Sequence, residues 1–245
     1  MIYLLSDIHG RKEKYEHILE KINLQPEDKL FILGDVIDRG PDGITLLQEI
    51  MVNPQIILLL GNHEHMMREA LEHPNNEMDL HRWYSNGGRI THKAYEKLSE
   101  DEQQIVLNYI KELPVNLSIT YNGHKYLLVH GAPLSMYTNQ FYEYLDAEQF
   151  SVWHRLPTDT PVPEGETIIF GHTPTMHYTD VSTPQKIWHG NGLIDLDCGC
   201  AYPEYGGQLG CLCLDSMKEY YSDIEDEPIT QEGDKNGETS VGSTD

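Results

Sequence analysis

Three short apolar segments in the first 60 residues each stop abruptly at polar residues. They run over residues 2–6, 29–33 and 55–60, and each is too short to make a helix of its own. The stretches between them, residues 11–22 and 43–51, carry apolar residues at helical spacing. This strand–helix–strand–helix–strand order predicts parallel strands joined by right-handed crossovers. We therefore expect the polar residues that follow the strands to meet at one edge of a sheet.

The second half of the chain has a different pattern. Residues 64–113 are polar and helical in pattern, and residues 115–129 predict a hairpin about Asn122-Gly123. Residues 134–150 are rich in aromatic side chains and predict a helical or loop cover. Further strands are expected at residues 167–170, 187–196 and 210–214, completing a second, mostly antiparallel sheet. The predicted fold class is α/β (α+β), a two-sheet β-sandwich flanked by helices, in one domain over residues 1–220.

The charge of the chain excludes several classes of partner. Among 245 residues, 17 Lys and Arg face 40 Asp and Glu, a formal net charge of −23. This excess of negative charge disfavours binding to nucleic-acid backbones and to anionic membranes. No segment reaches the ~20 apolar residues of a membrane span, and the apolar N-terminus meets Asp7 too early for a signal peptide. We expect a cytoplasmic protein that binds neither nucleic acid nor membrane; its oligomeric state stays open.

The last residues, 221–245, differ in composition from the rest. From residue 223 onward there are eight acidic residues, one lysine and no aromatic residue. Such a segment cannot bury enough apolar surface to offset its ordering entropy. We expect residues 221–245 to be a disordered acidic tail, and an acidic interaction tail is the alternative.

The four cysteines form two i, i+2 pairs, Cys198 with Cys200 and Cys211 with Cys213. On two paired strands, such residues could share a face and bring four thiols together. However, zinc sites usually have Cys-x2–4-Cys spacing rather than Cys-x-Cys. Four small buried thiols inside a sheet are therefore expected rather than a zinc site.

The candidate metal ligands are six residues that follow expected strands and carry oxygen or nitrogen donors: Asp7, His9, Asp35, Asn62, His130 and His172. A donor set without thiolates suits Mn²⁺, Fe or Zn²⁺. Six donors are too many for one ordinary site and enough for two metals that share a carboxylate, for which Asp35 is the natural bridge. A metal pair of this kind clamps the attacking and leaving oxygens of a phosphoryl transfer. Arg39, in the turn after Asp35, adds a planar fork for phosphate oxygens.

Five ordered motifs resemble the signature of the calcineurin-like metallophosphoesterases. They are Asp7-x-His9-Gly10, Gly34-Asp35-x-x-Asp38-Arg39-Gly40, Gly61-Asn62-His63-Glu64, His130-Gly131 and Gly171-His172-Thr173. Arg39 narrows the resemblance to the PPP-type serine/threonine protein phosphatases, in their small bacterial and phage-type branch, close to the symmetrical diadenosine tetraphosphatases. The run Trp83-Tyr84-Ser85-Asn86-Gly87-Gly88 also resembles an element common in that branch.

The resemblance implies a role for each motif residue. The first metal would be held by Asp7, His9 and Asp35, and the second by Asp35, Asn62, His130 and His172. His63 would be the general acid, oriented by Asp38. Substrate phosphate would be bound by Arg39, by Asn62 and by a second arginine in a Trp-x-Arg context, which Arg155 matches. The roles of Tyr202 and Tyr205, near a loop that resembles the late Tyr-x-Gly loop of the family, stay open.

Together these residues predict a metal-dependent phosphomonoester hydrolase, with a phosphorylated protein or small phosphoester as substrate. A hydroxide bridging two divalent ions, preferably Mn²⁺, would attack phosphorus in line while His63 protonates the leaving group. The alternative substrate is a dinucleoside polyphosphate such as diadenosine tetraphosphate. An inactive metal-binding scaffold is a remote alternative, because a scaffold has no physical reason to keep a general acid. The sequence does not choose between phosphoserine, phosphothreonine and phosphotyrosine.

Overall fold

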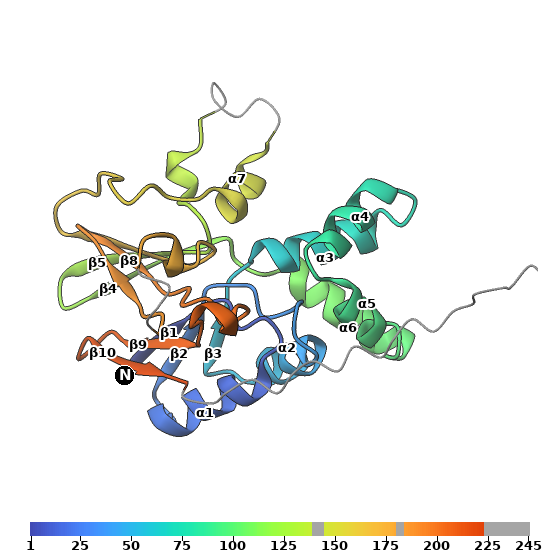
Figure 1. The fold of residues 1–245 in the computed structure, drawn as a ribbon, viewed down its shortest axis with the longest axis horizontal. Coiled ribbons are helices and arrows are strands. Elements are labelled where there is room, and N and C mark those ends of the chain that lie inside the picture. Colours follow the sequence, from blue (N-terminus) through green and yellow to red (C-terminus); the bar gives the residue numbers. More distant parts are fainter. Residues whose placement is uncertain (139–144, 180–183, 223–245) are drawn as a thin grey trace, which may run out of the picture.

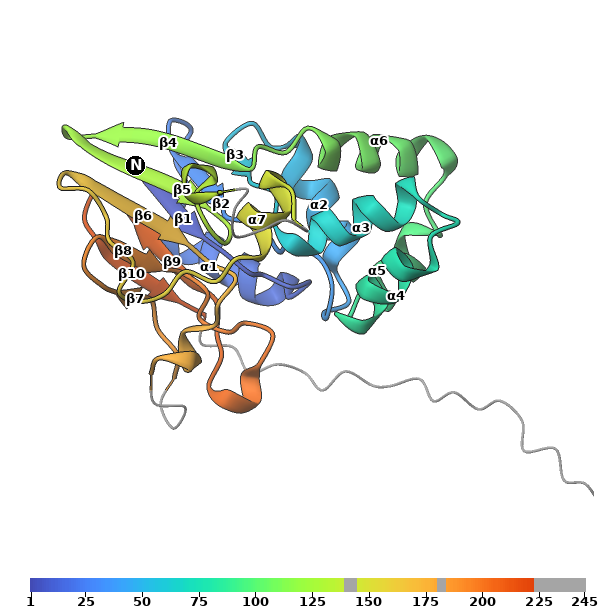
Figure 2. The same ribbon diagram turned by 90° about the horizontal axis from the view of Figure 1, so that it is seen from above.

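The computed structural model describes residues 1–138, 145–179 and 184–222. These residues form two five-stranded sheets that pack face to face (Figure 1). Helices cover the outer faces, and a group of helices extends from one end of the sandwich (Figure 2). The predicted two-sheet sandwich flanked by helices is confirmed.

The first sheet has the strand order β10-β9-β1-β2-β3. As predicted, its three N-terminal strands are parallel: β1 (Ile2–Leu5), β2 (Lys29–Ile32) and β3 (Ile56–Leu58). The connecting helices are α1 (Lys12–Ile22) and α2 (Gly43–Val52), which cover the outer face of this sheet (Figure 1). The carboxyl ends of β1, β2 and β3 therefore open on the same edge.

The prediction for the later strands was partly wrong. Strand β9 (Gly210–Cys213) belongs to the first sheet, where it pairs antiparallel with β1 and with β10 (Lys218–Tyr221). The expected single strand over residues 187–196 is two short antiparallel strands, β7 (Trp188–His189) and β8 (Leu193–Asp195). A buried apolar run predicts a strand but does not identify its neighbour, because pairing is decided by distant parts of the chain.

The second sheet is mixed rather than mostly antiparallel. Its order is β4-β5-β6-β8-β7. The predicted hairpin of β4 (Asn116–Tyr121) and β5 (His124–Val129) is present, but β5, β6 (Glu166–Phe170) and β8 run parallel. The long segment between β5 and β6 is what allows a parallel crossover, since parallel strands need a connection of about a dozen residues or more. A second set of strand ends thus faces the same region as the first.

Residues 64–113 form a helical arm, as their pattern predicts. The arm contains α3 (Asn62–Glu72), α4 (Glu77–Ser85), α5 (Arg89–Tyr95) and α6 (Glu100–Lys111). The Asn86-Gly87-Gly88 interruption separates α4 from α5. Within residues 134–150 lie a short 3₁₀ turn (Leu134–Met136) and the start of α7 (Ala147–Trp153), whereas the aromatic residues between 139 and 144 lie outside the described residues.

The apolar core follows the alternation of the strands. In β1, Tyr3 and Leu5 face the helices. Leu4 faces the second sheet and lies in the same apolar cluster as Leu128 and Ile169 of that sheet. A third cluster on the outer face of the second sheet packs under α7. This layering leaves only the strand ends free to carry polar chemistry.

All four cysteines are buried and free, as expected. Cys211 and Cys213 lie in β9, but Cys198 and Cys200 lie in the loop after β8, so the four thiols do not share a strand face. Burial raises the pKa of the Cys211 thiol, which keeps it protonated and unreactive.

Two further expectations concern the chain ends and membranes. Residues 223–245 of the expected tail lie outside the described residues, and Tyr221, placed in that tail by the sequence, still belongs to β10. Among the residues that the structure describes, no helix is both long enough and apolar enough to cross a bilayer.

Candidate active site

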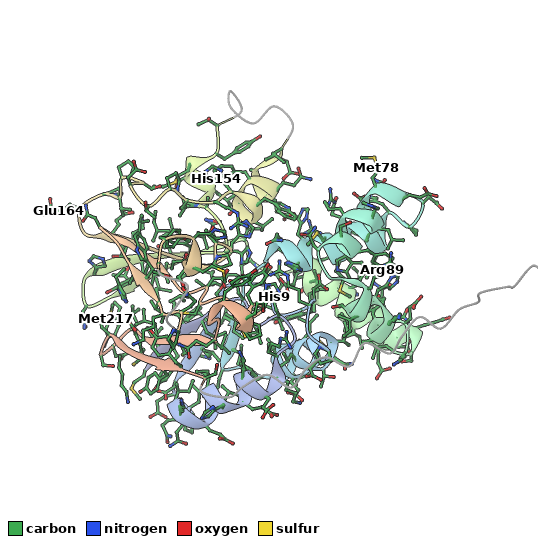
Figure 3. The ribbon with its side chains drawn as sticks, in the orientation of Figure 1. His9, Met78, Arg89, His154, Glu164 and Met217 are labelled. Atoms are coloured by element: carbon green, nitrogen blue, oxygen red, sulfur yellow. The ribbon has the colours of Figure 1, made fainter. Side chains whose placement is uncertain are left out.

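The six candidate metal ligands meet where the ends of both sheets face each other. Asp7 and His9 follow β1, Asp35 follows β2, and Asn62 is the first residue of α3 after β3. His130 follows β5 and His172 follows β6. All six are buried, and Figure 3 shows His9 near the centre of the molecule, between the sheets and the helical arm. The structure thus brings together every residue of the predicted ligand set.

Four of these residues have left-handed backbone conformations. The φ angles are 56° at Asp7, 50° at His9, 55° at Asp35 and 67° at His172. Hydrogen bonds between the first two turns hold this geometry, with His9 N donating to Asp35 O over 2.9 Å. Non-glycine residues rarely adopt such angles, and they persist where the surroundings over-determine them, as at functional sites.

The first group of donors surrounds His9. Its Nε2 lies 3.8 Å from Asp7 Oδ1 and 3.7 Å from Asp35 Oδ2. Its Nδ1 lies 3.2 Å from the carbonyl oxygen of Ile37, so Nδ1 carries the proton and the Nε2 lone pair faces the carboxylates. Burial, reinforced by the charge of Arg39, lowers the pKa of His9 well below its ordinary value, which keeps the ring in its neutral, metal-binding form.

The second group of donors surrounds the amide oxygen of Asn62. Its Oδ1 lies 2.9 Å from His130 Nε2 and 2.8 Å from His172 Nδ1. The other ring nitrogens face backbone carbonyls, at 2.6 Å from Leu33 O and 3.0 Å from Trp153 O. If those nitrogens carry the protons, two imidazole lone pairs and one amide oxygen converge, an arrangement that a cation would satisfy.

Asp35 connects the two groups. Its Oδ1 lies 3.4 Å from His130 Nε2, and its Oδ2 faces His9. Burial, together with the neighbouring charge of Asp7, raises the pKa of Asp35 well above its ordinary value, so the ionised carboxylate requires a compensating cation. The donors therefore fit two divalent cations that share Asp35. His63 Nε2, 3.8 Å from Asp35 Oδ2, also lies within reach of the first position, which the sequence did not indicate.

His63 and Asp38 form a buried pair beside the ligand set. His63 Nδ1 lies 2.6 Å from Asp38 Oδ2, and neither side chain is exposed to solvent. His63 Nε2 lies 3.1 Å from Nη2 of Arg39. The pair therefore has the geometry of an oriented imidazole, with its second nitrogen turned toward the arginine.

A cavity of about 280 Å³ opens beside these groups. Among its lining residues are Asp7, Asp35, Asn62 and His172, together with both predicted phosphate-binding arginines, Arg39 and Arg155. The other lining residues include Trp153, His177, Tyr202 and Tyr205. His9, His63 and His130 are not among the lining residues. A phosphate in the cavity could therefore contact both candidate metal positions and both arginines.

The two arginines are held in different ways. The guanidinium of Arg39 lies 3.0 Å from His9 Nε2 through Nη1, and its Cζ lies 5.2 Å from the ring centroid of Tyr202. Arg155 donates from Nη1 to the carbonyl oxygen of His172 over 3.3 Å. The ring of Tyr202 therefore makes a cation–π contact with Arg39. The sequence had left the role of Tyr202 open.

Glu64 is a positioning residue that sequence reasoning missed. Its fully buried carboxylate accepts four backbone N–H groups at 2.8 to 3.3 Å, those of Asp35, Val36, Ile37 and Gly61. It therefore ties the turn that carries Asp35 to the start of α3. The signal was present in the sequence, because a glutamate three residues after Gly61 has the spacing of a capping box.

Glu64→Gln should destabilise the fold by roughly 2–4 kcal/mol, because one amide NH₂ would face backbone N–H donors that the carboxylate now satisfies. Thermal unfolding would measure the loss, and metal content should fall with it. Glu69→Gln, a partly exposed glutamate in the same helix, is the matched control. Equal melting temperatures for the two variants would contradict this role of Glu64.

Asp197 is a second residue that the sequence analysis did not single out. Its carboxylate lines the cavity, and its Oδ1 accepts the backbone N–H of Gly199 over 2.9 Å. Burial, with added repulsion from Asp7 and Asp195, raises its pKa well above the ordinary value. It follows β8 just as the metal ligands follow their strands, and that position was the available signal.

Comparisons with known proteins agree with this geometry. Residues 1–195 match the family described as calcineurin-like phosphoesterase. The chain is 29% identical over 182 residues to a serine/threonine-protein phosphatase 2 of Salmonella typhimurium, covering 70% of this chain and 78% of that protein. It is 28% identical over 142 residues to a symmetrical bis(5'-nucleosyl)-tetraphosphatase of an Acidovorax species, covering 56% of this chain and 46% of that protein.

A solved structure shares the fold. It is a protein serine/threonine phosphatase from Saccharomyces cerevisiae with similarity to human phosphatase PP5, with a TM-score of 0.61, 15% identity, and coverage of 93% of this chain and 81% of that chain. At this identity the likeness concerns the fold alone. With the family match over most of its length and a divalent-metal donor set at its strand ends, the chain belongs to the calcineurin-like phosphoesterases and is a metallophosphatase.

Proposed function

We propose that the protein is a phosphomonoesterase, most closely a protein phosphatase, that works with two divalent ions, preferably Mn²⁺. The observation that carries the proposal is the donor set around Asp35, which adjoins a cavity lined by Arg39 and Arg155. The ions, when bound, would supply Lewis-acid charge to the phosphoryl group and activate a water molecule. One set would be Asp7, His9 and Asp35, and the other Asp35, Asn62, His130 and His172.

The chain's own residues have separate tasks in this proposal. Arg39 and Arg155 bind the phosphate oxygens through planar, charge-assisted hydrogen bonds, and Asn62 contributes from the cavity wall. His63, held by Asp38, donates a proton to the leaving oxygen. Arg39 Nη2 donates to His63 Nε2 in this structure, so Nε2 can donate only after the guanidinium has turned to the phosphate and the ring has taken up a proton there.

The chemistry of the cavity favours one phosphate group over a polyphosphate chain. Among the described residues that line it, the cationic side chains are two arginines, with no lysine, and Asp197 adds a carboxylate. The two proposed ions and the two arginines can pair the charges of one phosphate group, whereas the further phosphates of a dinucleoside tetraphosphate would meet no additional lysine or arginine among the described lining residues. It stays the second candidate, because a relative named as a symmetrical tetraphosphatase aligns with half of the chain.

A comparison of substrates tests the proposal. With added Mn²⁺, kcat/KM should be higher for phosphoserine, phosphothreonine or phosphotyrosine peptides than for diadenosine tetraphosphate. A higher kcat/KM for diadenosine tetraphosphate would instead identify the protein as a dinucleoside polyphosphate hydrolase. Absence of turnover on both, in protein that binds two ions, would support the inactive scaffold instead.

Arg39→Ala and Arg155→Ala should each retain the metals and lower kcat/KM roughly 10- to 100-fold, since a charge-assisted contact to phosphate is lost. KM and kcat should both change, because the contacts form in the ground state and strengthen in the transition state. Steady-state kinetics on a phosphopeptide would measure this. Arg89→Ala, in the helical arm and outside the cavity lining, is the control. Wild-type behaviour of Arg155→Ala would remove Arg155 from the site.

We further propose that the catalytic domain, expected over residues 1–220, extends to Ser222, that the acidic segment after it is dispensable, and that the protein works in the cytoplasm. Ser222, which exchanges two hydrogen bonds of 3.0 Å with Leu209, is the last described residue. Truncation after Ser222 should leave the melting temperature and small-substrate turnover nearly unchanged, because the deleted segment has few apolar residues to bury. A clear loss of melting temperature would show that the tail docks on the domain.

A further inference from the structure

The indole of Trp83 contacts the acid–base pair from the helical arm. Trp83 lies in α4 and is fully buried. Its Nε1 donates to both carboxylate oxygens of Asp38, over 3.1 Å to Oδ1 and 2.9 Å to Oδ2. A buried indole N–H needs an acceptor, and any backbone carbonyl would satisfy it. Here the acceptor is instead the carboxylate that holds His63 Nδ1.

The backbone of Asp38 depends on the same arm. Its N–H donates to Thr91 Oγ1 of α5 over 3.0 Å, and its φ of 69° is left-handed. Thus both the carboxylate and the main chain of Asp38 are held by residues that come about 50 positions later in the sequence. The turn after β2 alone does not determine where this carboxylate points.

The two glycines between α4 and α5 let this contact form. A Cβ at Gly88 would lie 2.3 Å from the Trp83 ring, and a Cβ at Gly87 would lie 2.9 Å from Cγ of Arg39. The carbonyl oxygen of Gly87 accepts the backbone N–H of Arg39 over 3.3 Å. The turn therefore packs directly on Trp83 and on Arg39. A side chain at either glycine would collide with one of these residues, so both glycines are needed for the contact between Trp83 and Asp38.

We propose that Trp83 is a positioning residue for proton donation: its indole N–H orients the Asp38 carboxylate, which in turn orients His63. The inference rests on the proposed role of His63 as general acid. Without the indole N–H, the carboxylate loses a charge-assisted hydrogen bond and is free to rotate away from the imidazole. The loss should appear where the leaving group needs a proton and be small elsewhere.

Trp83→Phe tests this, because it removes the N–H and keeps an aromatic ring. We expect kcat on a phosphoserine peptide to fall about tenfold, the effect of one hydrogen bond to a charged group. KM and metal content should be unchanged, and nitrophenyl phosphate, whose leaving group departs as a stable anion, should be hydrolysed almost as by wild type. Trp188→Phe, a partly buried tryptophan of β7 outside the cavity lining, is the matched control.

A spectroscopic measurement keeps the test independent of how well Trp83→Phe folds. The protein has three tryptophans, so its ¹H–¹⁵N spectrum has three indole N–H signals, assignable by the phenylalanine variants. In Asp38→Asn, the Trp83 signal should move upfield, since a neutral amide is a weaker acceptor than a carboxylate. The Trp188 signal should stay in place. An unmoved Trp83 signal would overturn the inference.

Combining Trp83→Phe with His63→Asn distinguishes a failure of the Trp83 inference from a failure of the assignment of His63 as general acid. If Trp83 acts through His63, the double variant should be no slower than His63→Asn alone. A further loss there, or equal losses by Trp83→Phe on both substrates, would make Trp83 a merely structural residue and overturn the inference while the acid assignment stands. If His63→Asn itself shows no dependence on the leaving group, the assignment of the acid fails, and the inference fails with it.

Discussion

Asp35→Asn should lose both metal ions and lower turnover by roughly 10³-fold or more, because a single side chain serves both positions. In the structure one carboxylate oxygen faces His130 and the other faces His9. An asparagine offers one oxygen and no charge, so the second position loses its only anionic ligand and the first position keeps only Asp7. Metal analysis after gel filtration should find well under one ion per chain, and the turnover of nitrophenyl phosphate should fall in parallel.

Asp79→Asn is the matched control for that experiment. Asp79 is also a buried aspartate, but it lies in α4, where it binds Arg82 over 2.9 Å. The control should keep both ions and full turnover even if it is less stable. Retention of one complete equivalent of metal by Asp35→Asn would show that Asp35 serves only one position. Undiminished activity after exhaustive chelation of the wild type would remove the metals from the mechanism altogether.

The candidate site was largely predictable because its residues stand at the ends of apolar runs. Asp7 and Asp35 follow strands that must be buried, so the topology alone places them at one edge. His172 could be predicted for the same reason, although it follows a strand of the other sheet. The resemblance to a known family then supplied roles that strand-end position cannot supply, such as that of His63.

What could not be predicted depends on contacts between distant segments. The sequence shows that Gly210–Cys213 is apolar, but only the folded chain shows that it pairs with β1 and not with the second sheet. The contacts of Glu64 and Trp83 are likewise between segments about 25 to 45 residues apart. Left-handed angles at Asp7 and His9 have no local signal either, because neither residue is a glycine.

His63→Asn should retain both ions and lower kcat on a phosphoserine peptide by about 10²–10⁴, the range of general acid catalysis. The physical reason is the alkoxide leaving group, which needs a proton that asparagine cannot supply. His63 is suited to this task because Asp38 holds its Nδ1 at 2.6 Å, which leaves Nε2 for the substrate. Nitrophenyl phosphate should lose far less, since its leaving anion is stable without a proton.

Asp38→Asn should show the same selectivity in weaker form, because it disturbs the orientation of the imidazole without removing it. Metal analysis of His63→Asn decides between the two roles that the geometry allows. His63 Nε2 lies among the donors of the first metal position, 3.8 Å from Asp35 Oδ2. Loss of one ion per chain, with equal rate losses on both substrates, would make His63 a metal ligand. Full metal content with a strong dependence on the leaving group would leave proton donation as its function.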